Sequence, residues 1–355
     1  MRRRSIFQHS EDLIPQFIHP KMTIPELIQT MGKTSFEARN LSRGTELFKS
    51  MIDEGETTWL GIAGAGVAGG MGGFVISLLE AGFIDVICST GAQVYHDLHF
   101  AFGLPVKAIH RPYDDNILRK HGDVRIYDIC IREKETLETQ DKTIQQFVKD
   151  KYAVLSKKMI SSWELNYHLG LWAEKNAPYP ERSFVVQAAR HGIPLFWDSL
   201  TNHSITMNLT QLDREGYPIQ LSAQKDIFDS AAIVYASRKT GFLILGGGGP
   251  KNFIQQTGPT LNQILHINYE GADRGIQIGT SMEREGSLSG CTFEEAVTWG
   301  KYRSADEKKL VHIWAEYSLI FPLITAYALD LCSKRTQKNV ISKMPQFIAN
   351  LEKQL

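Results

Sequence analysis

The sequence predicts an α/β protein with a doubly wound, mostly parallel sheet. The first observation is that apolar stretches of strand length alternate with stretches of helical periodicity. The second is that several apolar strands run directly into turns of glycine or small polar residues. The third is that the earliest of these turns has the G-x-G-x-x-G spacing of dinucleotide-binding folds. Open parallel sheets bind ligands at the carboxyl ends of their strands, so we expect the site along one edge of the sheet.

Composition limits the function. The 355 residues include 39 basic and 39 acidic residues, a balance that gives no general attraction to nucleic acid or to a membrane. The 4 cysteines are far apart and form no C-x-x-C pair, which is typical of reduced thiols and argues against a zinc site or a disulfide framework. Polar residues follow the basic start at residues 2–4, and no apolar run reaches the ~18 residues of a membrane helix. We therefore expect a cytoplasmic protein without a metal.

The chain is expected to divide into three parts. Residues 1–56 are polar with helical periodicity, and Thr23 followed by a proline and a glutamate predicts a helix start there. Residues 57–335 should form a single Rossmann-like domain that carries the candidate site. Residues 336–355 should form a helical tail at the C-terminus.

The first βαβ unit is expected at residues 57–88. A buried strand at 57–63 precedes the glycine-rich turn 64–70 and an apolar helix, and a second strand follows at 83–88. The turn is typical of dinucleotide or phosphate binding, but the same glycines also serve plain close packing. Asp85 lies near the offset of a ribose-binding carboxylate, or it is a strand acid with another partner.

A second turn of small residues follows that strand. Thr90, Gly91 and Ala92 lie where open parallel sheets bind ligands. His96 and His99 follow on a predicted helix. Two histidines at this spacing can hold a metal, although no third ligand is evident nearby, and surface or hydrogen-bonded histidines are the more common case.

The middle of the chain is less regular. Residues 105–165 are charged and periodic only in patches, which indicates a covering or inserted segment with a helix at 133–151. Another helix is expected at 183–190, followed by a short strand at 193–196. Residues 231–236 are apolar and fit either the end of a helix or a strand.

The last third of the chain contains the clearest βα pattern. A buried strand at 241–245 runs into four glycines at 246–249, whose backbone can approach a ligand because no Cβ stands in the way. Further strands are expected at 274–280 and 311–315, the second followed by an apolar helix. Glu316, at the end of that strand, suits a ribose hydroxyl or is an exposed capping acid.

Residues 285–303 point most clearly to chemistry. The stretch EGSLSG is small and polar, which suits backbone lying close to a ligand. Thr292 and Glu295 form a capping-box pattern, so a helix should begin there and end at Trp299 and Gly300. Lys301 would then lie at a helix end, beside a large aromatic side chain.

Two interpretations of Lys301 follow from these surroundings. An apolar environment removes hydration from the ammonium, lowers the pKa from about 10.4 and frees the amine to form a Schiff base. Alternatively, Lys301 is an ordinary solvated lysine in a last helical turn, favoured by the helix dipole.

The order of these motifs resembles the deoxyhypusine synthase family. The matching stretches are WLGIAGAG, DVICSTGAQV, LILGGGGPKN, GADRGIQIGTSMEREGSLSG, EEAVTWGK and AEYSLIFPL. They extend over most of residues 35–335, and their order and spacing are far more specific than any single motif. The resemblance favours the Schiff-base interpretation of Lys301. It also makes the expected fold a Rossmann-like NAD-binding fold of the deoxyhypusine synthase type.

The resemblance implies a concrete reaction. NAD takes a hydride from spermidine to give an imine, diaminopropane leaves, and the butylimine passes to an active-site lysine, which Lys301 matches. An acceptor amine then takes the aminobutyl group, and the hydride is returned. The acceptor is a lysine of a translation factor in deoxyhypusine synthase and putrescine in related homospermidine synthases. Members of the family are usually homotetramers with sites at dimer interfaces.

The same resemblance implies roles for further residues. Trp299 matches an aromatic residue that lines the amine channel, and Glu295 matches a carboxylate that holds the polyamine. Glu316 stands where the family has an aspartate near the cofactor. The residues that match NAD-binding positions are Thr90, Gly91, Ala92, Gly247, Gly248, Ser287, Ser289 and Glu316.

The sequence also departs from the family pattern. The family's histidine base corresponds to Asn252, which cannot act as a general base. A carboxylate of the cofactor turn is replaced by His96, which would supply the missing base if it lies near the site. Further acids of the family pattern are replaced at Asn202 and at Leu288, one that grips the far amine falls near Met207, and a tyrosine position becomes Gln277. About eight residues appear inserted near residues 258–269, a length that a surface loop tolerates.

These features leave one expected function and two alternatives. We expect NAD-dependent aminobutyl transfer from spermidine, through an imine on Lys301, to a small amine such as putrescine, because the missing acids weaken the case for the usual polycation site. The first alternative is a deoxyhypusine synthase that modifies a translation-factor lysine. The second is a non-catalytic NAD- or polyamine-binding protein. The presence of Lys301, Trp299 and Glu295 together argues against the second alternative, because binding alone would not need the lysine.

Overall fold

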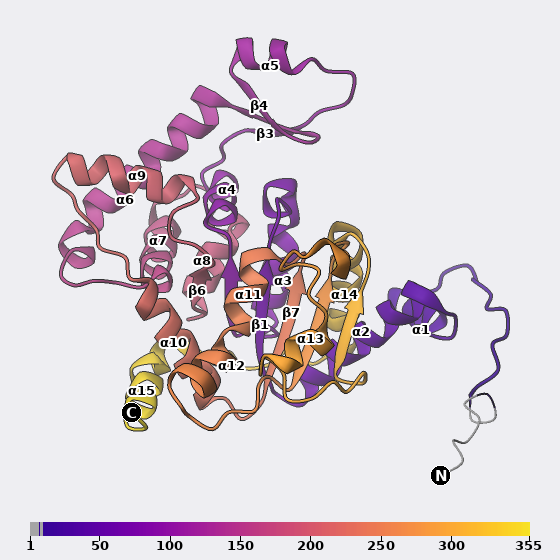
Figure 1. Cartoon of the computed structure of the whole chain (residues 1–355). Coiled ribbons are helices and arrows are strands. Elements are labelled where there is room, and N and C mark those ends of the chain that lie inside the picture. Colours follow the sequence, from indigo (N-terminus) through magenta and orange to yellow (C-terminus); the bar gives the residue numbers. More distant parts are fainter. Residues whose placement is uncertain (1–6, 8–9) are drawn as a thin grey trace.

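A six-stranded parallel sheet forms the centre of the computed structural model, which describes residue 7 and residues 10–355 (Figure 1). Its strands are β1 (Thr57–Ile62), β2 (Val86–Ser89), β6 (Leu195–Trp197), β7 (Thr240–Leu245), β8 (Arg274–Ile278) and β9 (Leu310–Ile313). They lie in the order β6-β2-β1-β7-β8-β9, and every neighbouring pair is parallel. The chain builds one half of the sheet from β1 outward to β6, and the other half from β7 outward to β9. This confirms the predicted α/β class with a doubly wound parallel sheet.

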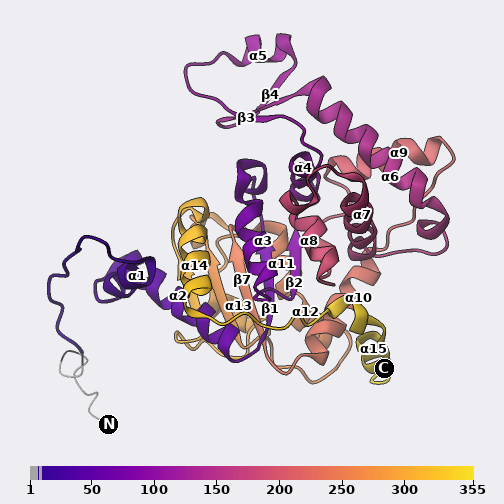
Figure 2. The ribbon, with the colours of Figure 1, turned by 180° about the vertical axis from the view of Figure 1, so that it is seen from behind.

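The strands place alternate side chains in two apolar layers, as strands buried on both faces do. In β7, Leu243 and Leu245 pack in one core cluster, while Phe242 and Ile244 pack in the other. Helices that contribute to the first layer are α2 (Phe36–Asp53), α3 (Gly72–Glu80), α8 (Phe184–Arg190) and α14 (Tyr317–Leu331), seen from behind in Figure 2. Helices that contribute to the second layer are α10 (Ala223–Ala236), α11 (Gly248–Gln255), α13 (Phe293–Thr298) and α15 (Val340–Glu352). Residues 231–236 therefore end a helix and are not a strand.

A separate group of elements extends beyond the β6 edge of the sheet (Figure 1). Its longer helices are α4 (Gly91–Ala101), α6 (Thr139–Leu155), α7 (Ser162–Asn176) and α9 (Ser204–Arg214). An arm carries α5 (Asp115–His121) and a three-stranded antiparallel sheet of β3 (Val106–Ala108), β4 (Asp123–Ile126) and β5 (Ile129–Arg132). Shorter helical turns are η2 (Val67–Met71), η3 (Glu133–Glu138), η4 (Pro180–Arg182), α12 (Thr257–Pro259), η5 (Thr260–Ile264) and η6 (Glu283–Glu285). The arm falls within residues 105–165, where the sequence indicates a covering or inserted segment.

The N-terminal helix α1 (Ile24–Gly32) begins as expected. Thr23 accepts a hydrogen bond from the backbone of Glu26, whose carboxylate accepts one from the Thr23 backbone, so the capping box is complete. Residues 10–22 form no helix, and residues 1–6 and 8–9, including the basic start of the sequence, lie outside the described residues. Among the helices that the structure describes, none is long and apolar enough to cross a membrane.

Asp85 lies at the amino end of β2, on the edge of the sheet opposite to the glycine-rich turns. Its side chain is 3% exposed and accepts a hydrogen bond from the backbone N–H of Thr58 at 2.9 Å. Its Oδ2 also lies 3.0 Å from Lys338 Nζ and 3.4 Å from Arg335. Asp85 therefore fastens the segment between α14 and α15 to the sheet. Of the two interpretations of this acid, the structure supports a strand acid with another partner.

We expect Asp85→Asn to lower the free energy of unfolding by about 2–4 kcal/mol, because it leaves two partly buried cations without their counter-charge. Urea unfolding measures this change. Asp53→Asn is the matched control, since it removes an exposed ion pair with Lys49 one helical turn away and should change stability by about 0.5 kcal/mol or less. Equal effects of the two substitutions would contradict this role of Asp85.

Candidate active site

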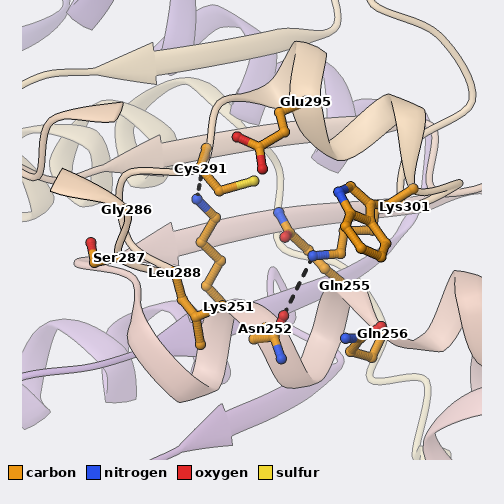
Figure 3. A pocket seen from close by; sticks show the side chains of 11 residues that line it. Lys251, Asn252, Gln255, Gln256, Gly286, Ser287, Leu288, Cys291, Glu295 and Lys301 are labelled. Carbon is orange, nitrogen blue, oxygen red and sulfur yellow. Dashed lines mark hydrogen bonds between the residues drawn. The ribbon is translucent and has the colours of Figure 1, made fainter. Parts of the chain in front are cut away.

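A pocket of about 250 Å³ lies beside α11 at the carboxyl edge of the sheet, and it contains the lysine singled out by the sequence (Figure 3). Its walls come from α11, from the loop that precedes α13, and from α13 with the turn that follows it. The lining residues are Lys251, Asn252, Gln255, Gln256, Gly286, Ser287, Leu288, Cys291, Glu295, Trp299 and Lys301. The structure thus brings Asn252, Ser287, Glu295, Trp299 and Lys301 together, as the sequence predicts.

The backbone of Lys301 is held on both sides. Gly300 has a left-handed φ of 70°, which ends α13 and turns the chain back, and the Lys301 N–H donates to the Ala296 carbonyl at 3.1 Å. The Lys301 carbonyl accepts a hydrogen bond from the Ala272 N–H at 3.0 Å. Tyr302 is 1% exposed and packs edge-on against Phe293. The position of the lysine is therefore fixed by the core and not by a free loop.

The side chain of Lys301 is buried among few polar partners. Lys301 is 7% exposed, and its Nζ donates to Asn252 Oδ1 at 3.4 Å, as Figure 3 shows. Burial lowers the pKa of Lys301, while the charges of Cys291 and Glu295 partly oppose this. A neutral amide oxygen stabilises an ammonium less than a carboxylate would. Burial therefore shifts Lys301 toward the free amine relative to a solvated lysine, and the free amine is the nucleophile that an imine requires.

Glu295 in α13 and Trp299 at the C-cap of α13 also line the pocket. Thr292 accepts a hydrogen bond from the Glu295 N–H at 3.2 Å, so the predicted N-cap of α13 is present. The Glu295 side chain does not return to the Thr292 backbone, so only half of the capping box forms, and the carboxylate points into the pocket (Figure 3). Trp299 is 61% exposed and lines the same pocket. Glu295 is thus free to hold a cation.

A second lysine, Lys251, was not expected in the site. It is 1% exposed, and its Nζ donates to the carbonyl oxygens of Ser289 at 3.2 Å and Cys291 at 2.6 Å. Burial lowers its pKa to about 8. These bonds join α11 to the loop before α13. No local pattern reports such contacts, and the signal in the sequence is a lysine one residue beyond the end of the glycine run.

The glycine turn after β7 meets the same loop. Gly248 N–H donates to Ser289 Oγ at 2.8 Å, and a Cβ at Gly247 would lie 2.7 Å from Ser289. Gln277 donates to the carbonyls of Gly246 at 3.0 Å and Ser289 at 2.8 Å, so it bridges the two segments. Gly247, Gly248 and Ser289, three of the residues expected to bind the cofactor, are therefore in contact. Gln277 is a second residue whose place the sequence pattern does not predict.

The other residues expected to bind the cofactor lie on the same edge of the sheet. Thr90, which follows β2, caps α4. The ring of His203 packs against Gly91, where an added Cβ would lie 2.2 Å from that ring. Ala92 follows in the first turn of α4. Glu316 follows β9 and accepts a hydrogen bond from the Ser318 N–H at 2.9 Å. Glu316 therefore caps α14, while its role toward a ribose hydroxyl stays a prediction.

The glycine-rich turn after β1 is already occupied by side chains. The Gly66 N–H donates to the Tyr317 hydroxyl at 2.9 Å, and the Val67 N–H donates to Gln93 Oε1 at 3.2 Å. The Tyr317 hydroxyl donates in turn to the Ala63 carbonyl at 3.0 Å. These N–H groups are the ones that a G-x-G-x-x-G turn would offer to a phosphate. The structure favours close packing as the reason for these glycines.

His96 does not reach the lysine pocket. It lies on α4, with its Nδ1 3.1 Å from His99 Nε2, and burial lowers its pKa. It is absent from the residues that line the pocket. Within the described part of the chain, no group of three or more His, Cys, Asp or Glu residues is arranged to hold a metal ion. In this chain His96 therefore does not replace the missing histidine base of Lys301.

The expected insertion near residues 258–269 begins in a packed segment. Gly258 is buried, Leu261 is 0% exposed, and a Cβ at Gly258 would lie 2.5 Å from the Gly300 carbonyl oxygen, so α12 packs against the turn that carries Lys301. Residues 262–269 are exposed or half-buried. Only the start of the insertion is therefore packed, and its tolerance as a surface loop stays a prediction.

Comparisons with known proteins agree with this arrangement. The family model for deoxyhypusine synthase matches residues 26–328. A deoxyhypusine synthase-like protein of Thermosynechococcus vestitus is 31% identical over 352 residues, covering 96% of this chain and 86% of the relative. A relative named "Probable deoxyhypusine synthase 2" in Methanosarcina acetivorans is 35% identical over 308 residues, covering 86% of each chain.

Solved structures show the same fold. A crystal structure of a protein assigned as a deoxyhypusine synthase of Entamoeba histolytica has a TM-score of 0.61 to this chain at 18% identity, covering 92% of this chain and 100% of that one. The family match extends over the sheet, the glycine turn and the lysine pocket alike. This chain belongs to the deoxyhypusine synthase family.

Proposed function

We propose that this protein transfers an aminobutyl group from spermidine, through an imine on Lys301, to a small amine such as putrescine, with NAD as cofactor. The observation that carries the proposal is Lys301 itself. It is a lysine 7% exposed that lines a pocket, with a pKa lowered by burial and a carboxylate, Glu295, lining the same pocket. A protein that only binds amines would gain nothing from a buried amine in that place, because two cations repel.

The described residues suit a nicotinamide cofactor at the turn after β7. Gly246 and Gly248 have φ of 78° and 57°, and a Cβ at Gly248 would have no neighbour closer than 3.9 Å, so the backbone is open to a ligand. This turn lies beside β1, where the order of the strands reverses, which is where open α/β sheets bind nucleotides. Gly247, Gly248, Ser287 and Ser289 would hold the cofactor, together with Thr90, Gly91, Ala92 and Glu316. The cofactor would supply the hydride acceptor.

The chain's own residues divide the remaining work. Glu295 holds the ammonium of the donor, and Trp299 covers its methylene chain at the rim of the pocket. Lys301 attacks the oxidised carbon, so that a C–N bond to Lys301 forms and the bond to diaminopropane breaks. Asn252 accepts a hydrogen bond from the lysine and orients it, but it cannot take a proton.

We further propose that the active form is a cytoplasmic homotetramer. The membership of the chain in the family supports this proposal. The same resemblance keeps a translation-factor lysine as an alternative acceptor. Asn252, where the family has a histidine base, favours the small amine, because the usual protein-modifying site is altered.

Mass spectrometry of the purified protein tests the proposal. The protein is incubated with NAD and spermidine, with and without putrescine, and then reduced with borohydride. We expect an aminobutyl adduct on Lys301, release of diaminopropane, and homospermidine when putrescine is present. Transfer to a translation factor but not to putrescine would support the protein-modifying alternative. Bound NAD with neither adduct nor diaminopropane would overturn aminobutyl transfer altogether.

A substitution at Asn252 tests the electrostatics of the lysine. Asn252→Asp places a carboxylate where the amide oxygen lies 3.4 Å from Lys301 Nζ, and this should raise the lysine pKa by about one unit or more. The free-amine fraction below that pKa then falls about tenfold at a given pH. We expect the pH profile of adduct formation to move to higher pH.

Asn350→Asp, which adds the same charge on α15, should leave that profile unchanged. A profile that stays in place in Asn252→Asp would show that the free amine of Lys301 does not limit the reaction.

A further inference from the structure

The Tyr317 hydroxyl forms two hydrogen bonds with the turn after β1. It accepts one from the Gly66 N–H at 2.9 Å and donates one to the Ala63 carbonyl at 3.0 Å. The diphosphate of a dinucleotide carries only acceptor oxygens, so it could replace the hydroxyl toward Gly66 but could not donate to Ala63. Displacement of Tyr317 by a nucleotide would therefore leave the Ala63 carbonyl without this donor, which costs free energy.

Gln93 makes a second bridge of the same kind. Its Oε1 accepts a hydrogen bond from the Val67 N–H at 3.2 Å, and its Nε2 donates to the Ile62 carbonyl at 3.0 Å. Gln93 lies in the first turn of α4 and is 2% exposed. An anion could again satisfy the N–H but not the carbonyl. The turn after β1 is therefore complementary to side chains that both donate and accept, and not to a phosphate.

The ring of Tyr317 also fills space beside this turn. Tyr317 is the first residue of α14, is half-buried, and packs against the first apolar layer. A Cβ at Gly66 would lie 2.5 Å from its hydroxyl, and a Cβ at Gly64 would lie 3.1 Å from it. Gly66 has an ordinary φ of −59°, so room for Tyr317 and not backbone conformation requires a glycine there.

The same ring reaches the neighbouring turn after β7. A Cβ at Gly246 would lie 3.8 Å from Tyr317 Cε1. One turn further along, the nearest neighbour of a Cβ at Gly248 would be Ala63 Cβ at 3.9 Å, so that part of the turn stays open. These two turns follow β1 and β7, between which the order of the strands reverses. The crevice at this point is therefore closed on its β1 side and open on its β7 side.

We propose that Tyr317 is a specificity-determining residue of this crevice, which excludes the diphosphate of a nucleotide from the turn after β1 and leaves the turn after β7 to hold it. The G-x-G-x-x-G spacing then serves Tyr317 and not a nucleotide. The proposal rests on the proposed function only for the identity of the nucleotide. Exclusion of phosphate follows from the hydrogen bonds and the ring of Tyr317 themselves.

Calorimetric titration of the full-length protein with NADH, and separately with inorganic pyrophosphate, tests the exclusion. Tyr317→Ala removes both the hydroxyl and the ring, which frees the Gly66 N–H and opens the crevice beside it. We expect both ligands to bind at least about fivefold more tightly to this variant. Tyr317→Phe keeps the ring, so both affinities should stay within about twofold of the native values. Tyr127→Ala, at a tyrosine 69% exposed on the arm, is the matched control and should change neither.

Hydrogen exchange of the native protein locates the bound nucleotide. We expect NADH to slow exchange in peptides that cover residues 246–250 and to leave exchange at residues 63–67 within about twofold of that in the free protein. This measurement needs no substitution, so it decides the question even if the midpoint of thermal unfolding shows that Tyr317→Ala is not folded.

Two results would overturn the exclusion by Tyr317. One is slower exchange at residues 63–67 on addition of NADH, which would place the diphosphate on the turn after β1. The other is a folded Tyr317→Ala protein whose affinities for NADH and pyrophosphate are unchanged. Absence of NADH binding by the native protein would instead overturn the cofactor of the proposed function, and the titrations with pyrophosphate would still decide the role of Tyr317.

Discussion

Replacement of Lys301 by arginine is expected to abolish the borohydride-trapped adduct and to lower the turnover of spermidine by at least about a thousandfold. Arginine keeps a positive charge and a long side chain, but its guanidinium stays protonated and cannot form the imine. The burial that lowers the pKa of Lys301 has no such effect on a group whose pKa exceeds about 12. The adduct is measured by mass spectrometry, and turnover by release of diaminopropane.

Two controls separate chemistry from folding in this experiment. Lys309→Arg makes the same change at a lysine whose side chain is 48% exposed beside Asp306, and it should leave turnover unchanged. Lys301→Arg should retain affinity for NAD, because the residues expected to bind the cofactor lie on other segments of the sheet edge. A Lys301→Arg protein that binds NAD and still releases diaminopropane at the native rate would overturn the covalent mechanism.

The fold could be predicted because its signals are local. The strand predicted at 241–245 has no polar side chain and is followed by four glycines. The capping box of α1 involves only Thr23 and Glu26, which are three residues apart. The helix end before Lys301 is marked by Gly300, which adopts the left-handed conformation that glycine permits. Each of these features depends on neighbours in the chain, so sequence patterns report them.

The rest of the site depends on partners far apart in the sequence. The Tyr317 hydroxyl that occupies the turn after β1 comes from 251 positions away, and the carbonyls that bind Lys251 come from 38 and 40 positions away. Lys338 reaches Asp85 across 253 positions. No periodicity or spacing reports contacts of this kind. This is why the sequence left the interpretations of Asp85 and of the turn after β1 open.

The start of the expected insertion at 258–269 is packed and not solvent-exposed. An insertion is expected to be tolerated when its backbone is solvent-exposed. Here α12 is buried against the lysine turn, and Leu261 in η5 is 0% exposed. This part of the insertion therefore supports the backbone of Lys301.

The sharpest test of this support is Gly258→Ala, which should lower turnover by about a hundredfold. The added Cβ would lie 2.5 Å from the Gly300 carbonyl oxygen and 3.5 Å from Lys301 Cα. Since the close neighbour is backbone, the lysine turn must move, and a displacement of about 1 Å at a reacting group reduces rates to this extent. The free energy of unfolding should fall by only about 1–3 kcal/mol, as for other overpacked sites.

Gly73→Ala supplies the comparison, because that glycine is exposed in α3 and a Cβ there meets nothing within 4 Å. It should raise stability by about 0.5–1 kcal/mol and leave turnover unchanged. If Gly258→Ala keeps at least half of the native rate, the packing of the insertion does not position the lysine. A loss of turnover in Gly258→Ala with NAD affinity retained would show that the inserted segment places the reacting amine, because the residues expected to bind the cofactor lie on other loops.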